Sequence, residues 1–143
     1  MAETSLPVDH LFTITATLGP ATAIEGGPNG SRRIIPVTGG TFEGPRLKGT
    51  IAPGPGGDWV LTRPDGSVRL DVRLTLLTDD GAAILMSYSG IGAMRDGGFG
   101  LRTAPQFETG DARYAWLNAV QAVGIGRPGK GGGSVSYDVY ALR

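Results

Sequence analysis

The sequence of 143 residues contains no cysteine and only one histidine, His10. The lack of cysteine excludes disulfides, thiolate catalysis and cysteine-ligated zinc. With a single histidine as well, the common zinc and copper sites cannot be assembled from this chain. No apolar run approaches the ~18 residues of a membrane-spanning helix, and the first ten residues lack the basic start and apolar stretch of a signal peptide. We therefore expect a cytoplasmic protein without a metal cofactor.

Charge of one sign is also lacking, because 13 basic residues balance 13 acidic ones. This balance gives no electrostatic footprint for nucleic acid or for an anionic membrane surface. Long stretches free of Gly and Pro are scarce, since 25 glycines and 10 prolines are spread along the chain. Helices typically need roughly 8–20 uninterrupted residues, so an all-helical bundle is excluded. A hydrophobic content of 40% is enough for one core, and we expect a single domain over residues 1–143.

Alternation of polar and apolar residues is the dominant pattern. Leu11–Leu18, for example, places Phe12, Ile14, Ala16 and Leu18 on one face and threonines on the other, as in a half-buried strand. We count roughly eight to ten such segments, which predicts an all-β antiparallel sandwich or barrel. Residues 21–31 are interpreted as a loop. Over residues 111–117 a short helical turn competes with a strand, with Asp111 as its N-cap.

The joints Pro64-Asp65-Gly66 and Asp79-Asp80-Gly81 are the most informative turns. Each fits a three-residue hairpin loop, in which a type I turn is closed by Gly in the left-handed region. The turn type fixes the register of the flanking strands, and the register fixes which side chains share a face. In this register Asp58, Val72 and Tyr88 form one cross-strand row on the apolar face. A carboxyl and a phenol would then flank a valine inside the sheet.

Acid–base chemistry is what the remaining residue types support. A carboxyl buried among apolar groups has a raised pKa, which makes it a usable acid or base near neutrality. The candidate catalytic residues are Asp58, Tyr88 and Glu43, the last beside the Gly44-Pro45 break. Asp58 capping the Gly-rich loop before it, and Glu43 stabilising a turn, are the structural alternatives.

Six further residues are candidates for a substrate pocket. They are polar, aromatic or flexible side chains next to turns or on predicted strand faces: Met86, Arg102, Glu108, Tyr114, Trp116 and Asn118. Aromatic residues at alternate positions are also typical of a core, and Glu108 of a turn.

Two familiar motifs carry no function here. Gly124–Gly129 matches G-x-G-x-x-G, but a dinucleotide site needs a following helix within about 30 residues of βαβ, and only the last 14 residues remain. We expect this segment at the tip of a last hairpin, and no organic cofactor. A Ser–His–Asp hydrolase is also not expected, because His10 has no evident partner and no G-x-S-x-G is present.

Several short segments, taken in order, resemble domain-of-unknown-function family 3237, also called uncharacterised protein family 0311. They are TGGTFEGPRLKG (38–49), DW (58–59), RPDG (63–66), TDDG (78–81), FETG (107–110) and YAWLN (114–118). The resemblance runs from Leu11 to Tyr140 and implies a compact antiparallel β-barrel of bacterial or fungal origin. It implies no established activity and no catalytic residues.

Three functions are compatible with the sequence. The first is a cofactor-independent enzyme of lyase, hydratase, isomerase or cyclase type, acting on a small apolar or unsaturated carbonyl substrate inside a barrel. Asp58 would move the proton and Tyr88 would donate to developing oxyanion charge. The second is a non-catalytic small-ligand carrier that uses the same cavity. The third is a filled barrel whose outer face forms a homodimer. None of the three involves nucleic acid or a membrane.

Overall fold

Almost every alternating segment of the sequence forms a strand in the computed structural model, which describes all 143 residues. Two short 3-10 helices, η1 and η2, interrupt the strands. The elements, in chain order, are β1 (Val8–Leu18), β2 (Thr22–Gly27), β3 (Gly30–Glu43), β4 (Lys48–Ile51), β5 (Gly57–Thr62), β6 (Val68–Thr78), β7 (Ala83–Arg95), β8 (Gly98–Thr103), β9 (Gln106–Glu108), η1 (Ala112–Ala119), β10 (Ala122–Pro128), η2 (Lys130–Gly132) and β11 (Ser134–Leu142). No helix is long and apolar enough to cross a membrane.

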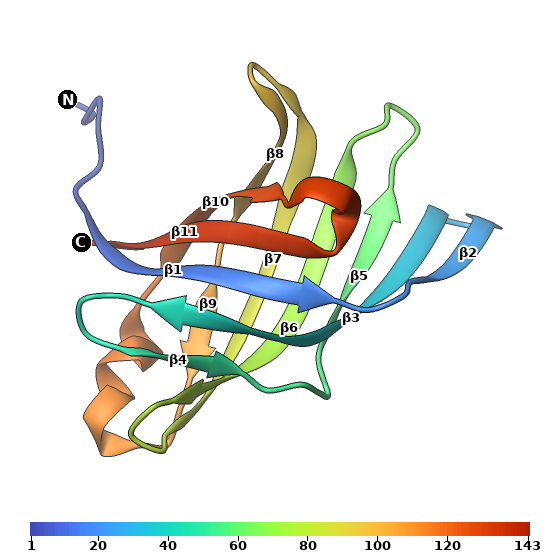
Figure 1. Cartoon of the computed structure of the whole chain (residues 1–143). Coiled ribbons are helices and arrows are strands. Elements are labelled where there is room, and N and C mark those ends of the chain that lie inside the picture. Colours follow the sequence, from blue (N-terminus) through green and yellow to red (C-terminus); the bar gives the residue numbers. More distant parts are fainter.

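Eight strands close into a ring, in the order β1-β3-β5-β6-β7-β8-β10-β11 and back to β1. All neighbours in the ring are antiparallel, so every main strand edge is paired (Figure 1). The short strands β4 and β9 add to β3, β6 and β7 near one end of the ring. The prediction of an all-β antiparallel barrel is confirmed.

Strand β2 corrects the prediction of a loop over residues 21–31. It pairs antiparallel with residues 30–34 of β3. Strand β1 pairs with β3 only as far as Val37, whereas β3 continues beyond that point towards Gly30. That extension would otherwise expose a row of unpaired N–H and C=O groups, and β2 covers it. The local sequence does not contain this signal, because the free edge arises from the relative lengths of distant strands.

The two Gly-closed hairpin loops form as predicted. Arg63 N–H donates to Ser67 O over 2.8 Å, and Thr78 N–H donates to Ala82 O over 2.9 Å. Gly66 and Gly81 close these loops with φ angles of 84° and 95°, which is the left-handed region that favours glycine. The resulting register places Asp58 opposite Val72 and Val72 opposite Tyr88, which confirms the predicted cross-strand row.

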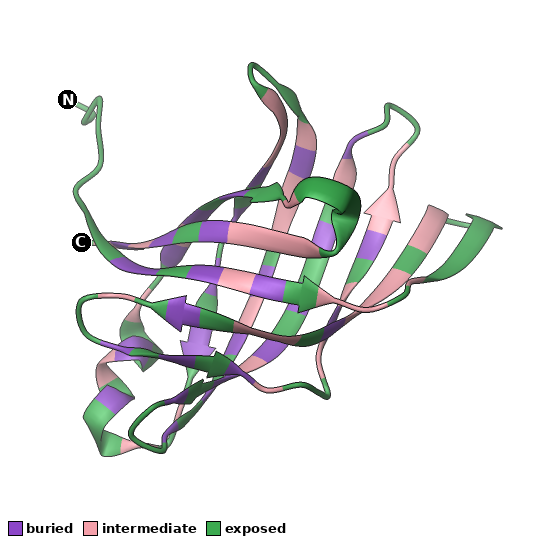
Figure 2. Cartoon of the chain, viewed as in Figure 1, coloured by how far each residue is buried: buried purple, intermediate pink, exposed green.

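One half of the barrel interior is filled by large apolar side chains. Phe12 packs against Phe42 and Phe107, with ring centroids 5.5 and 6.0 Å apart. Helix η1 covers this end and buries Tyr114 and Leu117, at the lower left in Figure 1. The predicted N-cap is confirmed, since the carboxylate of Asp111 accepts the Arg113 N–H over 2.9 Å. In Figure 2 buried and exposed positions alternate along the ring strands, as a barrel with one inner face requires.

The opposite end of the barrel is framed by β2, by η2 and by the hairpins β5–β6 and β7–β8 (Figure 1). The prediction that Gly124–Gly129 forms the tip of the last hairpin is corrected, because the segment lies in β10 as far as Pro128 and the tip begins only at Gly129. Residues 91–100 extend β7 and β8 and so form a hairpin, of which Phe99 lines the interior. This end has a hollow interior.

Candidate functional site

The hollow end of the barrel encloses a cavity of about 460 Å³. Sites for small molecules typically measure ~300–1,000 Å³, so the cavity has room for one small ligand. Of its 21 lining residues 14 are hydrophobic, contributed by strands all around the ring. The polar side chains that line it are those of Arg33, Asp58, Tyr88, Ser134 and Tyr137. An apolar cavity with a few polar groups has the usual composition of a binding site.

Asp58 is held in a gap between β5 and β6. The ladder is regular at Asp58 and again from Leu61, and it is interrupted in between. In a regular ladder of this register the Asp71 N–H would face the carbonyl of Trp59. Instead, Asp71 N–H donates to Asp58 Oδ1 over 3.1 Å, and the Trp59 carbonyl accepts from Arg32 Nη1 over 3.0 Å. The carboxyl group is thus fixed by one oxygen to the backbone of β6.

Burial among apolar residues raises the pKa of Asp58 to about 6. The Asp71 N–H bond opposes this rise in pKa, and the charge of the Asp71 carboxylate adds to it. A carboxyl with this pKa gives and takes protons readily near neutrality. The expectation that Asp58 caps the preceding loop is corrected, because its hydrogen bond reaches across to β6.

Two tyrosines lie inside the same cavity, Tyr88 on β7 and Tyr137 on β11. Their rings pack edge to face, with centroids 5.4 Å apart and an interplanar angle of 68°. Burial raises the pKa of Tyr88, and the neighbouring Tyr137 and the Asp58 charge raise it further. Burial and the Asp58 charge also raise the pKa of Tyr137. Both phenols are therefore neutral over the physiological range and are available as hydrogen-bond donors.

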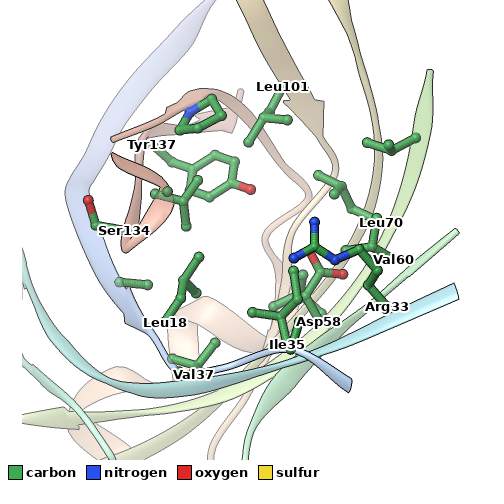
Figure 3. A pocket seen from close by; sticks show the side chains of 18 of the residues that line it. Leu18, Arg33, Ile35, Val37, Asp58, Val60, Leu70, Leu101, Ser134 and Tyr137 are labelled. Carbon is green, nitrogen blue, oxygen red and sulfur yellow. The ribbon is translucent and has the colours of Figure 1, made fainter. Parts of the chain in front are cut away.

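Figure 3 shows how the labelled polar side chains are placed around the cavity. Arg33 and Asp58 project from neighbouring strands of one wall, while the Tyr137 hydroxyl points inward from another part of the ring. Of the three predicted catalytic residues, the structure brings Asp58 and Tyr88 together. Glu43 lies exposed at the end of β3, opposite Lys48 and outside the cavity.

Three of the predicted pocket residues belong to the closed end instead. The Tyr114 hydroxyl donates to the Asp80 carboxylate over 2.8 Å. Trp116 lies beneath the Arg46 guanidinium, 3.6 Å from its ring centroid. The Asn118 side chain binds the backbone of Thr109, between β9 and η1: its Oδ1 accepts the Thr109 N–H over 2.8 Å, and its Nδ2 donates to the Thr109 carbonyl over 3.0 Å. These side chains hold η1 against the barrel, so the expectation that they line the substrate pocket is corrected.

The other three also lie away from the cavity. Met86 is 1% exposed and fills the packed half of the barrel, opposite Phe107. Arg102 and Glu108 occupy outward strand positions and are exposed. Two geometric conditions decide whether a strand residue lines the cavity. Its side chain must point to the inner face, because successive side chains point to opposite faces, and it must lie at the hollow end of the barrel.

Sequence reasoning missed Arg33, Ser134 and Tyr137. Tyr137 shares the inner face of β11 with Val139, and the more exposed Asp138 lies between them. This alternation is visible in the sequence and could have pointed to Tyr137. Its register, however, depends on a long Gly-rich hairpin loop that no standard turn type fixes. Finally, no three His, Asp or Glu side chains are grouped so that they could hold a metal ion.

Comparison with known proteins gives a family match along almost the whole chain. The family model described as "Protein of unknown function (DUF3237)" matches residues 6–98 and 92–142. A UPF0311 protein of Rhodopseudomonas palustris is 33% identical over 155 aligned residues, which cover 96% of this chain and 97% of that protein. A hydroalkoxylation enzyme of Penicillium herquei is 32% identical over 118 residues, covering 82% of this chain and 72% of that enzyme.

Solved structures show the same architecture. A β-barrel-like protein from Acinetobacter baumannii superposes with a TM-score of 0.90 at 33% identity, covering 99% of each chain. An enzyme from Penicillium herquei superposes with a TM-score of 0.77 at 27% identity, covering 100% of this chain and 98% of that one. The similarity therefore extends to a barrel that works as an enzyme.

Proposed function

The chain belongs to the DUF3237 family, and from this premise we propose that it is an enzyme for proton-transfer addition at a small unsaturated substrate. The reaction class is that of a lyase or cyclase, in which an O–H group adds across a carbon–carbon double bond. The observation that carries the proposal is a carboxyl group with a pKa of about 6, fixed in an apolar cavity beside two neutral phenols. The hydroalkoxylation enzyme among its relatives supports the same class of reaction.

The proposed step needs no oxidant, reductant or second substrate. Asp58 removes the proton from a hydroxyl group of the bound substrate, and that oxygen forms a bond to the far carbon of a conjugated C=C bond. The π electrons move to the carbonyl oxygen, where a tyrosine hydroxyl donates a hydrogen bond to the developing negative charge. The protonated Asp58 then delivers its proton to the neighbouring carbon. The product is an isomer of the substrate with one new C–O bond.

Both alternatives to an enzyme make use of the same barrel. A carrier would need the apolar cavity alone, whereas affinity for an apolar ligand has no use for a carboxyl that interrupts the β5–β6 ladder. A filled barrel that acts only through its outer face is disfavoured by the 460 Å³ cavity.

Turnover by matched variants tests the proposal. A panel of hydroxyl-bearing α,β-unsaturated ketones is incubated with the protein, and isomers of unchanged mass are separated by chromatography. We expect Asp58→Asn to lower kcat by about 10²–10⁴-fold, the usual contribution of a general acid–base group. Tyr88→Phe should lower it by about 10²-fold or more. Glu43→Gln removes a carboxylate outside the cavity and should leave the rate unchanged.

The pH dependence gives an independent readout. For Asp58 acting as base, kcat/KM of the wild type should rise with pH through an apparent pKa near 6, and Asp58→Asn should lack this rise. Full turnover in both Asp58→Asn and Tyr88→Phe would contradict the assignment. Binding of the panel without any conversion would favour the carrier.

A further inference from the structure

Arg33 occupies an unusual place for a cation. It lies on β3 opposite Val60, on the inward face that continues with Ile35 and Val37, and it lines the cavity. Its outward neighbour Arg32 has a fixed role, since Nη1 binds the Trp59 carbonyl. Arg33 is exposed at the cavity mouth, so its charge stays hydrated while its stem borders the apolar interior.

No acidic side chain of the chain neutralises Arg33. Every ion pair involves other residues, and no hydrogen bond to the Arg33 guanidinium is formed. Arg113 shows the contrast, because it reaches the carboxylates of both Asp80 and Asp111. The guanidinium of Arg33 therefore keeps its donors free, in the fork geometry that binds an anionic oxygen.

The position of Arg33 relative to Asp58 would give a bound molecule a defined orientation in the cavity. Asp58 lies opposite Ile35, so the two charged residues are diagonal neighbours on β3 and β5, roughly 7–8 Å apart at Cα. They do not pair, although Figure 3 shows both side chains projecting from this wall into the cavity. A group bound at Arg33 would sit at the mouth, and the rest of the molecule would extend past Asp58 towards the apolar interior.

We propose that Arg33 is the specificity-determining residue for an anionic oxygen of the substrate. The substrate class is then a small molecule with an apolar body and, at one end, a carboxylate or phenolate oxygen distinct from the hydroxyl that reacts. This inference rests on the proposed function for the identity of the cavity as the substrate site. It adds an orientation, because the charged end remains at the mouth while the unsaturated part reaches Asp58 and Tyr88.

Calorimetric titration of the unmodified protein with matched probes tests the proposal. The carboxylate pair is 2-naphthoate and its neutral analogue 2-naphthalenemethanol. The phenolate pair is 4-nitrophenol, measured under alkaline conditions where it is ionised, and neutral 4-nitroanisole. The variants are Arg33→Gln, the conservative Arg33→Lys, and Arg69→Gln, which removes the same charge from the outer face of β6.

We expect the wild type to prefer the anion of at least one pair, and the pair that shows this preference identifies the headgroup. Arg33→Gln should weaken binding of that anion by about 10- to 100-fold and change binding of its neutral analogue by no more than about twofold. Arg33→Lys should retain part of the preference, and Arg69→Gln should retain all of it.

Two results would overturn the inference. The first is a wild type without preference for either anion, and the second is an Arg33→Gln variant that loses anion and neutral probe equally. Either result leaves Asp58-dependent turnover untouched, so the proposed function would survive. If neither compound of either pair binds to the wild type, the cavity is no ligand site and both proposals fail.

Discussion

Replacing Asp58 by asparagine should stabilise the folded protein at neutral and alkaline pH. Burial raises the pKa of Asp58 from 3.8 to about 6 in the folded chain. Between these two values the folded state holds a proton that the unfolded chain has already released, so the free energy of unfolding falls as the pH rises. One pKa unit corresponds to about 1.36 kcal/mol, so the shift costs the wild type about 3 kcal/mol above pH 6.

Asparagine removes this cost and keeps the local geometry. Its side-chain oxygen takes the place of Asp58 Oδ1 and accepts the Asp71 N–H bond that spans 3.1 Å in the wild type. The buried amide group loses some hydration, and this loss does not depend on pH. The decisive quantity is therefore the change with pH of the stability difference between the variant and the wild type.

Urea denaturation of both proteins at a series of pH values measures this change. We expect the free energy of unfolding of Asp58→Asn, relative to the wild type, to increase by about 3 kcal/mol between roughly pH 4 and pH 7 and to stay constant at higher pH. All other titrating groups are common to both proteins and cancel in the difference. A difference independent of pH would refute the reasoning, because it would mean that the carboxyl has an ordinary pKa in the folded state.

Two further substitutions test how the two ends of the barrel are built. A Cβ atom at Gly126 would overlap Cδ1 of Tyr137, so Gly126→Ala should displace this ring, cost about 1–3 kcal/mol in chemical denaturation and reduce turnover. Gly110→Ala, where a Cβ meets no neighbour, is its control, and equal effects of the two would contradict the argument. Leu117 is fully buried under η1, so Leu117→Ala should lower unfolding free energy by about 2–5 kcal/mol. An unchanged melting temperature would show that η1 is not needed to close the barrel.

The part of the fold that the sequence predicts best depends on local turn chemistry. Two loops closed by Gly66 and Gly81 determine three consecutive strands, and from these strands the row from Asp58 to Tyr88 follows without further information. The family resemblance and the all-β barrel are also confirmed, because both were inferred from patterns that extend along the whole chain.

What the sequence does not predict depends on long-range closure. The pairing of β1 with β11, and of β2 with the free edge of β3, joins segments whose partners no local turn specifies. Tyr137 reaches the cavity through the pairing of β11 with β1, and Arg33 through the equally long-range pairing of β3 with β5. The residues near Trp116 show the reverse case. Their side chains are chemically suitable for a pocket, but η1 places them at the other end of the barrel.

The division of the barrel into a packed half and a hollow half has an evolutionary consequence. The same strands run through both halves, so rigidity supplied around Phe12 and Leu117 extends to the walls around the empty space. Substitutions at cavity-lining residues such as Leu18, Ile35 or Phe99 would change the shape of the cavity without disturbing the packed half of the barrel. If the cavity is the substrate site proposed above, a handful of wall positions sets which molecule fits while the architecture stays constant.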